Sequence, residues 1–171
     1  MNRPTIVVVA CLALASCASP PDDRQAKVKA TVAEFYRNFD EGFNTPADYA
    51  TGDWYHINPY GGVDKGRDAT LETVRDVHRS FLKGTKDTVK DIDIRFASDD
   101  VAVATVTSEM TPFTSPDGVR HGVERHLRTF VVVKRDSGWL IMQDHNTTVV
   151  PLPPPPGEQP AGAAPPPAER K

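Results

Sequence analysis

The spacing of apolar residues changes partway along the chain, and this change constrains the fold more than any other feature. Up to about residue 82, apolar side chains recur at steps of three and four residues, the spacing of amphipathic helices. From residue 92 onward they alternate with polar residues, the spacing of strands with one buried face. The helical stripes consist of Val28, Val32, Phe35, Tyr36, Phe39 and Phe43, and of Leu71, Val74, Val77, His78, Phe81 and Leu82. Helices therefore precede the main run of strands.

The pattern also predicts where these elements begin and turn. The second helix is expected to follow residues 66–68, with Asp68 as its N-cap. Long antiparallel strands are expected over residues 92–96, 101–110, 124–133 and 139–149, after a short strand near residues 54–58. Turn sequences occupy residues 115–118 and 136–138. The order predicts an α+β domain with helices on one face of a curved antiparallel sheet.

The first residues have the composition of an export signal. The apolar run from Ile6 to Leu14 is shorter than the ~20 residues that a membrane-spanning helix needs. It leads into Leu14-Ala15-Ser16-Cys17, which resembles the lipobox of bacterial lipoproteins. The resemblance implies that residues 1–16 are a signal peptide, that Cys17 becomes the acylated first residue, and that residues 17–23 are a lipidated linker. The alternative is an ordinary signal peptide with a chance cysteine.

The expected location is therefore the cell envelope. Several acyl chains on one cysteine, palmitate among them, would hold the protein stably at a membrane. Ala18 and Ser19 follow the cysteine, and the absence of an acidic residue there favours the periplasmic face of the outer membrane in a Gram-negative source, or otherwise the cell membrane.

Residues 24–150 form one body without an internal repeat, and residues 151–171 differ from it in composition. Nine of the chain's sixteen prolines lie in this last segment. Proline-rich sequence with little to bury is expected to be an extended, disordered tail.

Charge and motif content argue against several classes of protein. The chain has a net charge of −3 and no Lys/Arg cluster, so a nucleic-acid partner is not expected. No Gly-x-Gly-x-x-Gly follows a predicted strand, so no dinucleotide cofactor is expected. No metal site is expected, because there is no His-x-x-x-His pair and Cys11 leaves with the signal.

Short motifs along the body resemble one family in their order and spacing. They are Gly42 after the first helix, Ile57-Asn58-Pro59-Tyr60-Gly61, Gly66-Arg67, Ile94-Arg95-Phe96 before residues 99–103, Arg128-Thr129, and Gly138-Trp139 before His145-Asn146-Thr147. Together they resemble the SgcJ/EcaC branch of the SnoaL-like proteins. The resemblance implies a cone-shaped nuclear transport factor 2-like fold, with helices packed into the concave face of a bent sheet around an open-ended pocket. It also implies a homodimer formed through the sheet.

Related folds include ketosteroid isomerases and polyketide cyclases, which use a carboxylate base and donors that hold an enolate. The position of the isomerase base corresponds to Asn58 here, and an amide cannot accept a proton at neutral pH. The helix tyrosine of those enzymes falls at Phe35, beside Tyr36, and their protonated aspartate falls near residues 129–130. Isomerase chemistry by that mechanism is therefore not expected.

Strand alternation puts Trp54, His56 and Asn58 on one side of the short strand. The resemblance places Asn58 in the pocket, so His56 would face inward as a candidate base. The alternative is a rim histidine bonded to water. His78 lies within the second helical stripe, where it would bind a ligand or pack in the core with a backbone partner.

Two later strands supply further candidates. Asp144 and His145 cannot share a face, and position in the family favours His145, with Asn146, as the pocket residue. Glu109 is a candidate carboxylate if Thr105, Thr107 and Glu109 face inward; the alternative is an ion pair with Arg125 or Arg128. Arg128 and Tyr36 complete the candidate ligand-binding set.

Three functions stay open on this basis. The first is a lipid-anchored domain that binds a small, mostly apolar molecule, oriented by Asn58, Glu109 and His145. The second is a lyase or isomerase in which His145 or His56 removes a proton and Asn58 or Arg128 supports an oxyanion. The third is an envelope interaction module whose proline tail reaches a partner protein.

Overall fold

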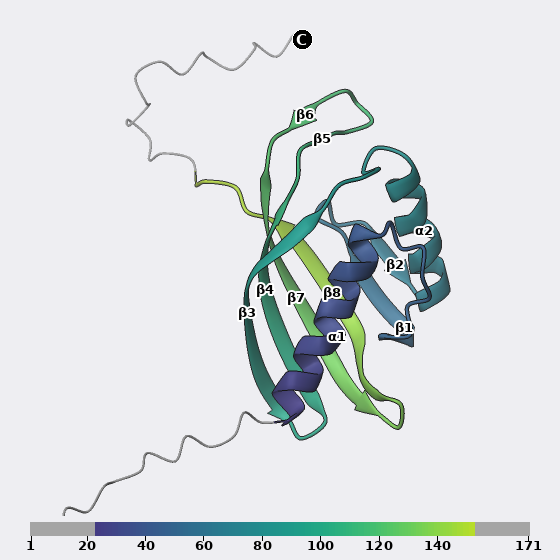
Figure 1. The fold of residues 1–171 in the computed structure, drawn as a ribbon, viewed down its shortest axis with the longest axis vertical. Helices are drawn as coiled ribbons and strands as arrows, with labels where there is room; N and C mark the ends of the chain where they lie inside the picture. Colours follow the sequence, from purple (N-terminus) through teal and green to yellow (C-terminus); the bar gives the residue numbers. More distant parts are fainter. Residues whose placement is uncertain (1–22, 153–171) are drawn as a thin grey trace, which may run out of the picture.

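The computed structural model describes residues 23–152, so the signal peptide, Cys17 and most of the proline-rich tail lie outside the described residues. The fold is α+β, as predicted (Figure 1). Its elements are α1 Asp23–Asp40, β1 Ala50–Ile57, β2 Val63–Lys65, α2 Arg67–Arg79, β3 Asp87–Ser98, β4 Val101–Met110, β5 Phe113–Thr114, β6 Arg120–His121, β7 Glu124–Arg135 and β8 Gly138–Thr148. None of the helices within this range is long and apolar enough to cross a membrane.

Six strands form one curved sheet in the order β2-β1-β8-β7-β4-β3, and β5 and β6 form a separate hairpin. The expectation of an all-antiparallel sheet is wrong at one pair, because β1 runs parallel to β8. A hairpin forces its two strands to be antiparallel, but β1 and β8 are separated by α2 and the whole β3–β7 segment. The sheet is therefore mixed.

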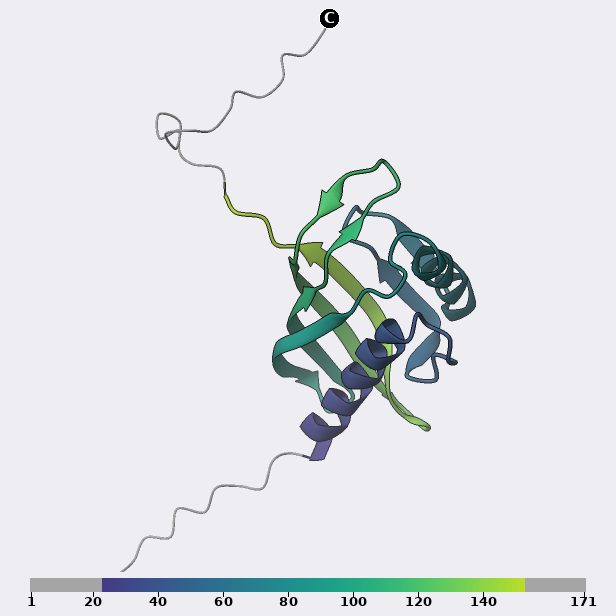
Figure 2. The same cartoon turned by 45° about the horizontal axis from the view of Figure 1, so that its top comes forward.

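Both helices lie on the concave face of this sheet, with α1 crossing β3, β4, β7 and β8 and α2 beside β1 and β2 (Figures 1 and 2). Phe35, at the centre of α1, is 1% exposed and packs edge-on against Trp54 and Phe130 of the sheet. Ala102 and Ala104 of β4 are fully buried and belong to the same core. The core is thus the space between α1 and the sheet.

The ends of the helices differ from the sequence expectation. Asp68 does not cap α2; the N-cap is Gly66, with φ 91°, and its carbonyl accepts hydrogen bonds from both the backbone N–H and the hydroxyl of Thr70. Phe43 belongs to the apolar stripe of α1 but lies after its end, where it adopts φ 55° and stays 2% exposed. Both predicted turns are present, at residues 115–118 and 136–138.

The inward face of β4 does not include Glu109, so the condition for Glu109 as a pocket carboxylate is not met. The buried residues are Ala102, Ala104, Val106, Ser108 and Met110. Thr105, Thr107 and Glu109 therefore lie on the outer face, where Glu109 pairs with Lys90 at 2.9 Å. Arg125, one of its two expected partners, is the cross-strand neighbour of Glu109 but makes no ion pair with it, and the other, Arg128, lies on the inner face.

Candidate functional site

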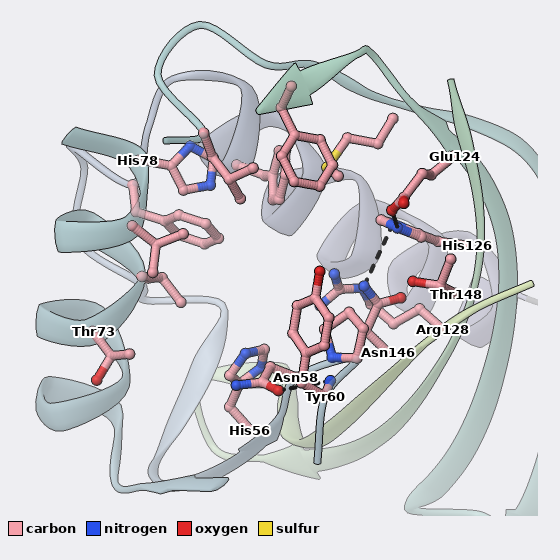
Figure 3. Close-up of a pocket in the computed structure, with 18 of the residues that line it drawn as sticks. His56, Asn58, Tyr60, Thr73, His78, Glu124, His126, Arg128, Asn146 and Thr148 are labelled. Atoms are coloured by element: carbon pink, nitrogen blue, oxygen red, sulfur yellow. Dashed lines mark hydrogen bonds and ion pairs between the residues drawn. The ribbon is translucent and has the colours of Figure 1, made fainter. Parts of the chain in front are cut away.

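A cavity of about 140 Å³ lies between the C-terminal part of α1, the helix α2 and the inner face of β1, β7 and β8 (Figure 3). One wall is apolar and consists of Phe39, Phe43, Val74, Val77, Phe81, Leu82, Met110 and Phe113. The other wall is polar and includes His56, Asn58, Asp64, Glu124, His126, Arg128, Asn146 and Thr148. A cavity of about 150 Å³ holds one benzene molecule, so this one has room for about one ring.

A buried carboxylate organises the polar wall from behind. Asp144 of β8 is 0% exposed and accepts hydrogen bonds from the indole Nε1 of Trp54 at 2.8 Å and from Nη1 of Arg128 at 2.6 Å. His56 Nδ1 lies 3.0 Å from both carboxylate oxygens. Burial alone would raise the pKa of Asp144, but the charges of His56 and Arg128 and these hydrogen bonds hold it below its ordinary value. Asp144 is therefore an anion.

The charge of Asp144 determines how His56 presents its ring. An ionised carboxylate only accepts hydrogen bonds, so Nδ1 of His56 must carry the proton in this pair. The other ring nitrogen, Nε2, makes no hydrogen bond within residues 23–152, and the side chain lines the cavity. His56 is also the register partner of Asp64 on one side and of Asp144 on the other. An imidazole oriented in this way by a carboxylate can take up a proton at Nε2.

Asn58 is held by the turn between β1 and β2. Its Oδ1 accepts the backbone N–H groups of Tyr60 at 2.9 Å and Gly62 at 3.0 Å. These bonds fix the amide, and they leave Nδ2 without a hydrogen-bond partner in the described part of the chain. Asn58 lines the cavity as expected, and what it offers is a fixed N–H donor.

A second polar group lies around His126 of β7. Nε2 of this histidine is 3.3 Å from Glu124, and Nδ1 is 3.4 Å from the amide of Asn146 and 3.6 Å from Asp87. Two buried acceptors stay without a hydrogen bond here, Oδ1 of Asn146 and the carboxylate of Asp87. Burial would raise the pKa of Asp87, but His126, Arg128 and Ser108 lower it below its ordinary value. Figure 3 shows Glu124, His126 and Asn146 along one side of the cavity.

Several predicted site residues are placed differently from expectation. His145 is exposed and lies on the outer face of the sheet, so Asp144, and not His145, points inward with Asn146 on alternate positions. Trp54 and Tyr36 are buried but lie behind the cavity wall, Trp54 on Asp144 and the Tyr36 hydroxyl 3.5 Å from Ser108. Glu109 lies on the outer face.

The other predicted residues line the cavity, and some lining residues were missed. His78 packs edge-on against Phe39 and Phe43, and burial lowers its pKa to about 4. Arg128 stacks 4.7 Å from the ring centre of Phe35. His126 and Glu124 were not predicted as site residues, although strand alternation from Arg128 puts both on the same face of β7.

Within residues 23–152 there is no group of three or more His, Cys, Asp or Glu side chains that could hold a metal ion. Comparison with known proteins finds no matching family model and no matching curated protein.

Solved structures do match. An uncharacterised protein with a cystatin-like fold from Caulobacter vibrioides has a TM-score of 0.70 at 22% identity, over 76% of this chain and 92% of that one. A ketosteroid isomerase-like protein from Erwinia carotovora atroseptica has a TM-score of 0.63 at 19% identity, over 76% and 99% of the two chains. A nuclear transport factor 2-like protein with a cystatin-like fold from Novosphingobium aromaticivorans has a TM-score of 0.62 at 15% identity, over 74% and 82%. The chain therefore has the nuclear transport factor 2-like, cystatin-like fold.

Proposed function

We propose that the pocket binds a small, mostly apolar molecule and that His56 exchanges a proton with it, in an isomerase or lyase reaction. The observation that carries the proposal is the His56–Asp144 pair, in which a buried carboxylate holds one ring nitrogen and the other is left at the cavity. The similarity to a ketosteroid isomerase-like protein is consistent with this chemistry.

The proposed step begins with a C–H group next to a carbonyl. Nε2 of His56 takes the proton, the electron pair of the C–H bond forms a C=C bond, and the π pair of the carbonyl moves onto its oxygen to give an enolate. Asp144 stabilises the imidazolium that forms, as the buried carboxylate does in a catalytic triad. Return of the proton to a different carbon gives an isomer, and departure of a leaving group gives a lyase product.

Asn58 is proposed to stabilise the enolate oxygen. Because its Oδ1 is fixed by Tyr60 and Gly62, its Nδ2 donor does not have to reorient when charge develops. Asn58 is then a hydrogen-bond donor and not the base, and the base is His56, two residues earlier on the same strand face.

The test does not require the natural substrate. Single-ring ketones are incubated with the protein in D2O, and deuterium uptake next to the carbonyl is followed by NMR. The His56→Gln variant is expected to lose about 10²- to 10⁴-fold of the exchange rate, the usual contribution of a general base. His145→Gln is the matched control, because His145 lies on the outer face, and it should exchange at the wild-type rate. Saturable binding of a ketone without deuterium uptake would show that the domain binds the ligand but does not transfer a proton.

We also propose that this domain is a lipoprotein of the cell envelope and that it belongs to the SgcJ/EcaC branch of the SnoaL-like proteins. The lipobox-like sequence before Cys17 supports the first statement, and the motif order supports the second. Cys17→Ser is expected to move the protein from the membrane pellet to the soluble fraction. A variant that still sediments with membranes would contradict the lipid anchor.

A further inference from the structure

We infer that the pocket selects an organic cation, a molecule of about one ring that carries a protonated amine. The inference rests on the proposed small-molecule function of the same pocket and adds the charge of the ligand. It depends on the balance of charges along the polar wall.

Carboxylates outnumber cations on this wall. Asp64 and Glu124 line the cavity, and Asp144 and Asp87 lie directly behind it. Among the described lining residues, Arg128 is the only permanent cation, and its Nη1 is already 2.6 Å from Asp144. Three histidines lie beside these carboxylates, namely His56, His126 and His121, the last at 2.8 Å from Glu124, and the negative charge is balanced only if all three are protonated. His78 adds no positive charge, because its pKa of about 4 keeps it neutral at pH 7.

The hydrogen-bonding groups of the wall are also short of donors. Asn146 is 3% exposed, lines the cavity, and has no partner for its Oδ1. Asp87 is 2% exposed and lies behind this wall beside His126, so it adds negative charge to the wall without lining the cavity. Buried acceptors without donors cost free energy, and an ammonium group supplies three N–H donors and no acceptor.

The opposite wall suits the rest of such a ligand. Four phenylalanine rings line it, those of Phe39, Phe43, Phe81 and Phe113. Aromatic faces bury an apolar body and also attract a cation through their ring quadrupoles. A carboxylate ligand would instead meet Glu124 and Asp64, with the Arg128 charge already engaged by Asp144.

Three probes of one size and different charge test the inference. Benzylamine, which is protonated at pH 7, benzyl alcohol and benzoate are titrated into the protein by calorimetry at low salt. Benzylamine is expected to bind about tenfold more tightly than benzyl alcohol, with benzoate weakest, because hydrogen bonds between charged groups are about twice as strong as neutral ones. Equal or tighter binding of the alcohol or of benzoate would overturn the cation inference and leave the proposed pocket function standing. Failure of all three probes to bind would overturn both.

A pair of carboxylate variants locates the effect. Glu124→Gln removes one charge from the cavity wall with little change in shape, and it is expected to weaken benzylamine about tenfold while benzyl alcohol changes less than twofold. Glu109→Gln is the control, because it removes the same charge from the outer face of the sheet, and it should leave both affinities unchanged. Equal weakening of both probes by Glu124→Gln would indicate a structural effect and contradict the inference.

Discussion

At the scale of single residues, Asp144 holds the inner face of the sheet together. Its carboxylate joins Trp54 and His56 of β1 to Arg128 of β7, and no part of it reaches solvent. Removal of one partner from a buried ion pair leaves the other charge uncompensated, which usually costs more than the pair itself contributes.

Asp144→Asn is therefore expected to lower the free energy of unfolding by about 3 to 5 kcal/mol, measured by urea denaturation. Asp99→Asn is the matched control, because the side chain of Asp99 is 98% exposed in its pair with Arg24. Exposed pairs contribute about 0 to 1 kcal/mol, so the control should unfold close to the wild type. Similar losses of unfolding free energy in the two variants would show that the buried cluster contributes no more to stability than an exposed ion pair.

His78 gives a prediction about pH. Burial against Phe39 and Phe43 lowers its pKa to about 4, whereas an unfolded histidine titrates near 6.5. Below about pH 6.5 the unfolded chain therefore takes up a proton that the folded chain does not, and stability falls until the pH reaches about 4.

The His78→Phe variant lacks this titration. Between pH 7 and pH 5 the wild type is expected to lose about 1 to 2 kcal/mol more free energy of unfolding than the variant, a figure that allows for partial solvent access. The two pH profiles, each from urea denaturation, are compared by slope, so a constant difference from altered packing does not matter. Parallel profiles would contradict the low pKa of His78.

At the scale of elements, the β1–β2 turn positions Asn58. A Cβ atom on Gly62 would lie 2.4 Å from Nδ2 of Asn58, too close for the amide to stay where it is. Gly62→Ala is expected to displace the amide, to cost about 1 kcal/mol of stability through the lost hydrogen bonds, and to slow the deuterium exchange that tests the proposed function. Gly122→Ala is the control, because no atom lies within 4 Å of its added Cβ. Wild-type exchange in Gly62→Ala would remove Asn58 from the mechanism.

Most helices and strands were predicted near their observed positions, β4 with its bounds Val101–Met110, but the inward face was clear only for elements with a single apolar face. α1 and α2 each carry one stripe, and β7 and β8 alternate between buried and exposed positions along most of their length. β4 is different, since Val103 and Val106 put apolar side chains on opposite faces, and alternation alone does not say which face is inward. The structure puts the even-numbered residues inward, with Ala102, Ala104 and Val106 fully buried.

The candidate site could be predicted only in part, for a related reason. On β1, alternation put Trp54 and His56 on one face and the resemblance favoured that face as the inner one, with a rim position as the alternative for His56; both side chains are buried. On β8, the polar run at 144–146 gave no preference, and position in the family favoured His145. What places Asp144 inward is its partnership with Trp54, His56 and Arg128, which come from strands up to 90 residues away. A single sequence does not show such long-range pairs.

At the scale of the whole molecule, the pocket and the chain's first described residue lie at different ends. Asp23 begins α1, and the pocket is lined by Phe39 and Phe43 near the end of that helix, toward the β5–β6 hairpin (Figures 1 and 2).

Both helices cover the same face of the sheet, and no described element covers the other face (Figure 2). Leu127, near the start of the central strand β7, is 42% exposed on this outer face, and its register neighbours are Thr107 and Thr147. The two central strands present Thr105, Thr107, Leu127, Thr129 and Val131 on this face, with charged residues such as Glu109 and Arg125 toward one end. A face of this kind can pair with a second copy, which buries about 800 Å² on each partner in a typical stable interface. We therefore expect a homodimer formed through the sheet.

Sedimentation equilibrium on the purified protein should give twice the mass of one chain. Leu127→Lys is expected to shift the protein toward monomer, because the interface would then bury an unpaired charge from each partner. Val119→Lys is the control, since Val119 is 52% exposed but lies in the hairpin between β5 and β6, apart from the sheet. A wild-type monomer at tens of micromolar, or a Leu127→Lys variant that stays dimeric, would show that the outer face has no such role. A dimer of this kind leaves the pocket of each copy open, because the pockets lie on the opposite face of the sheet.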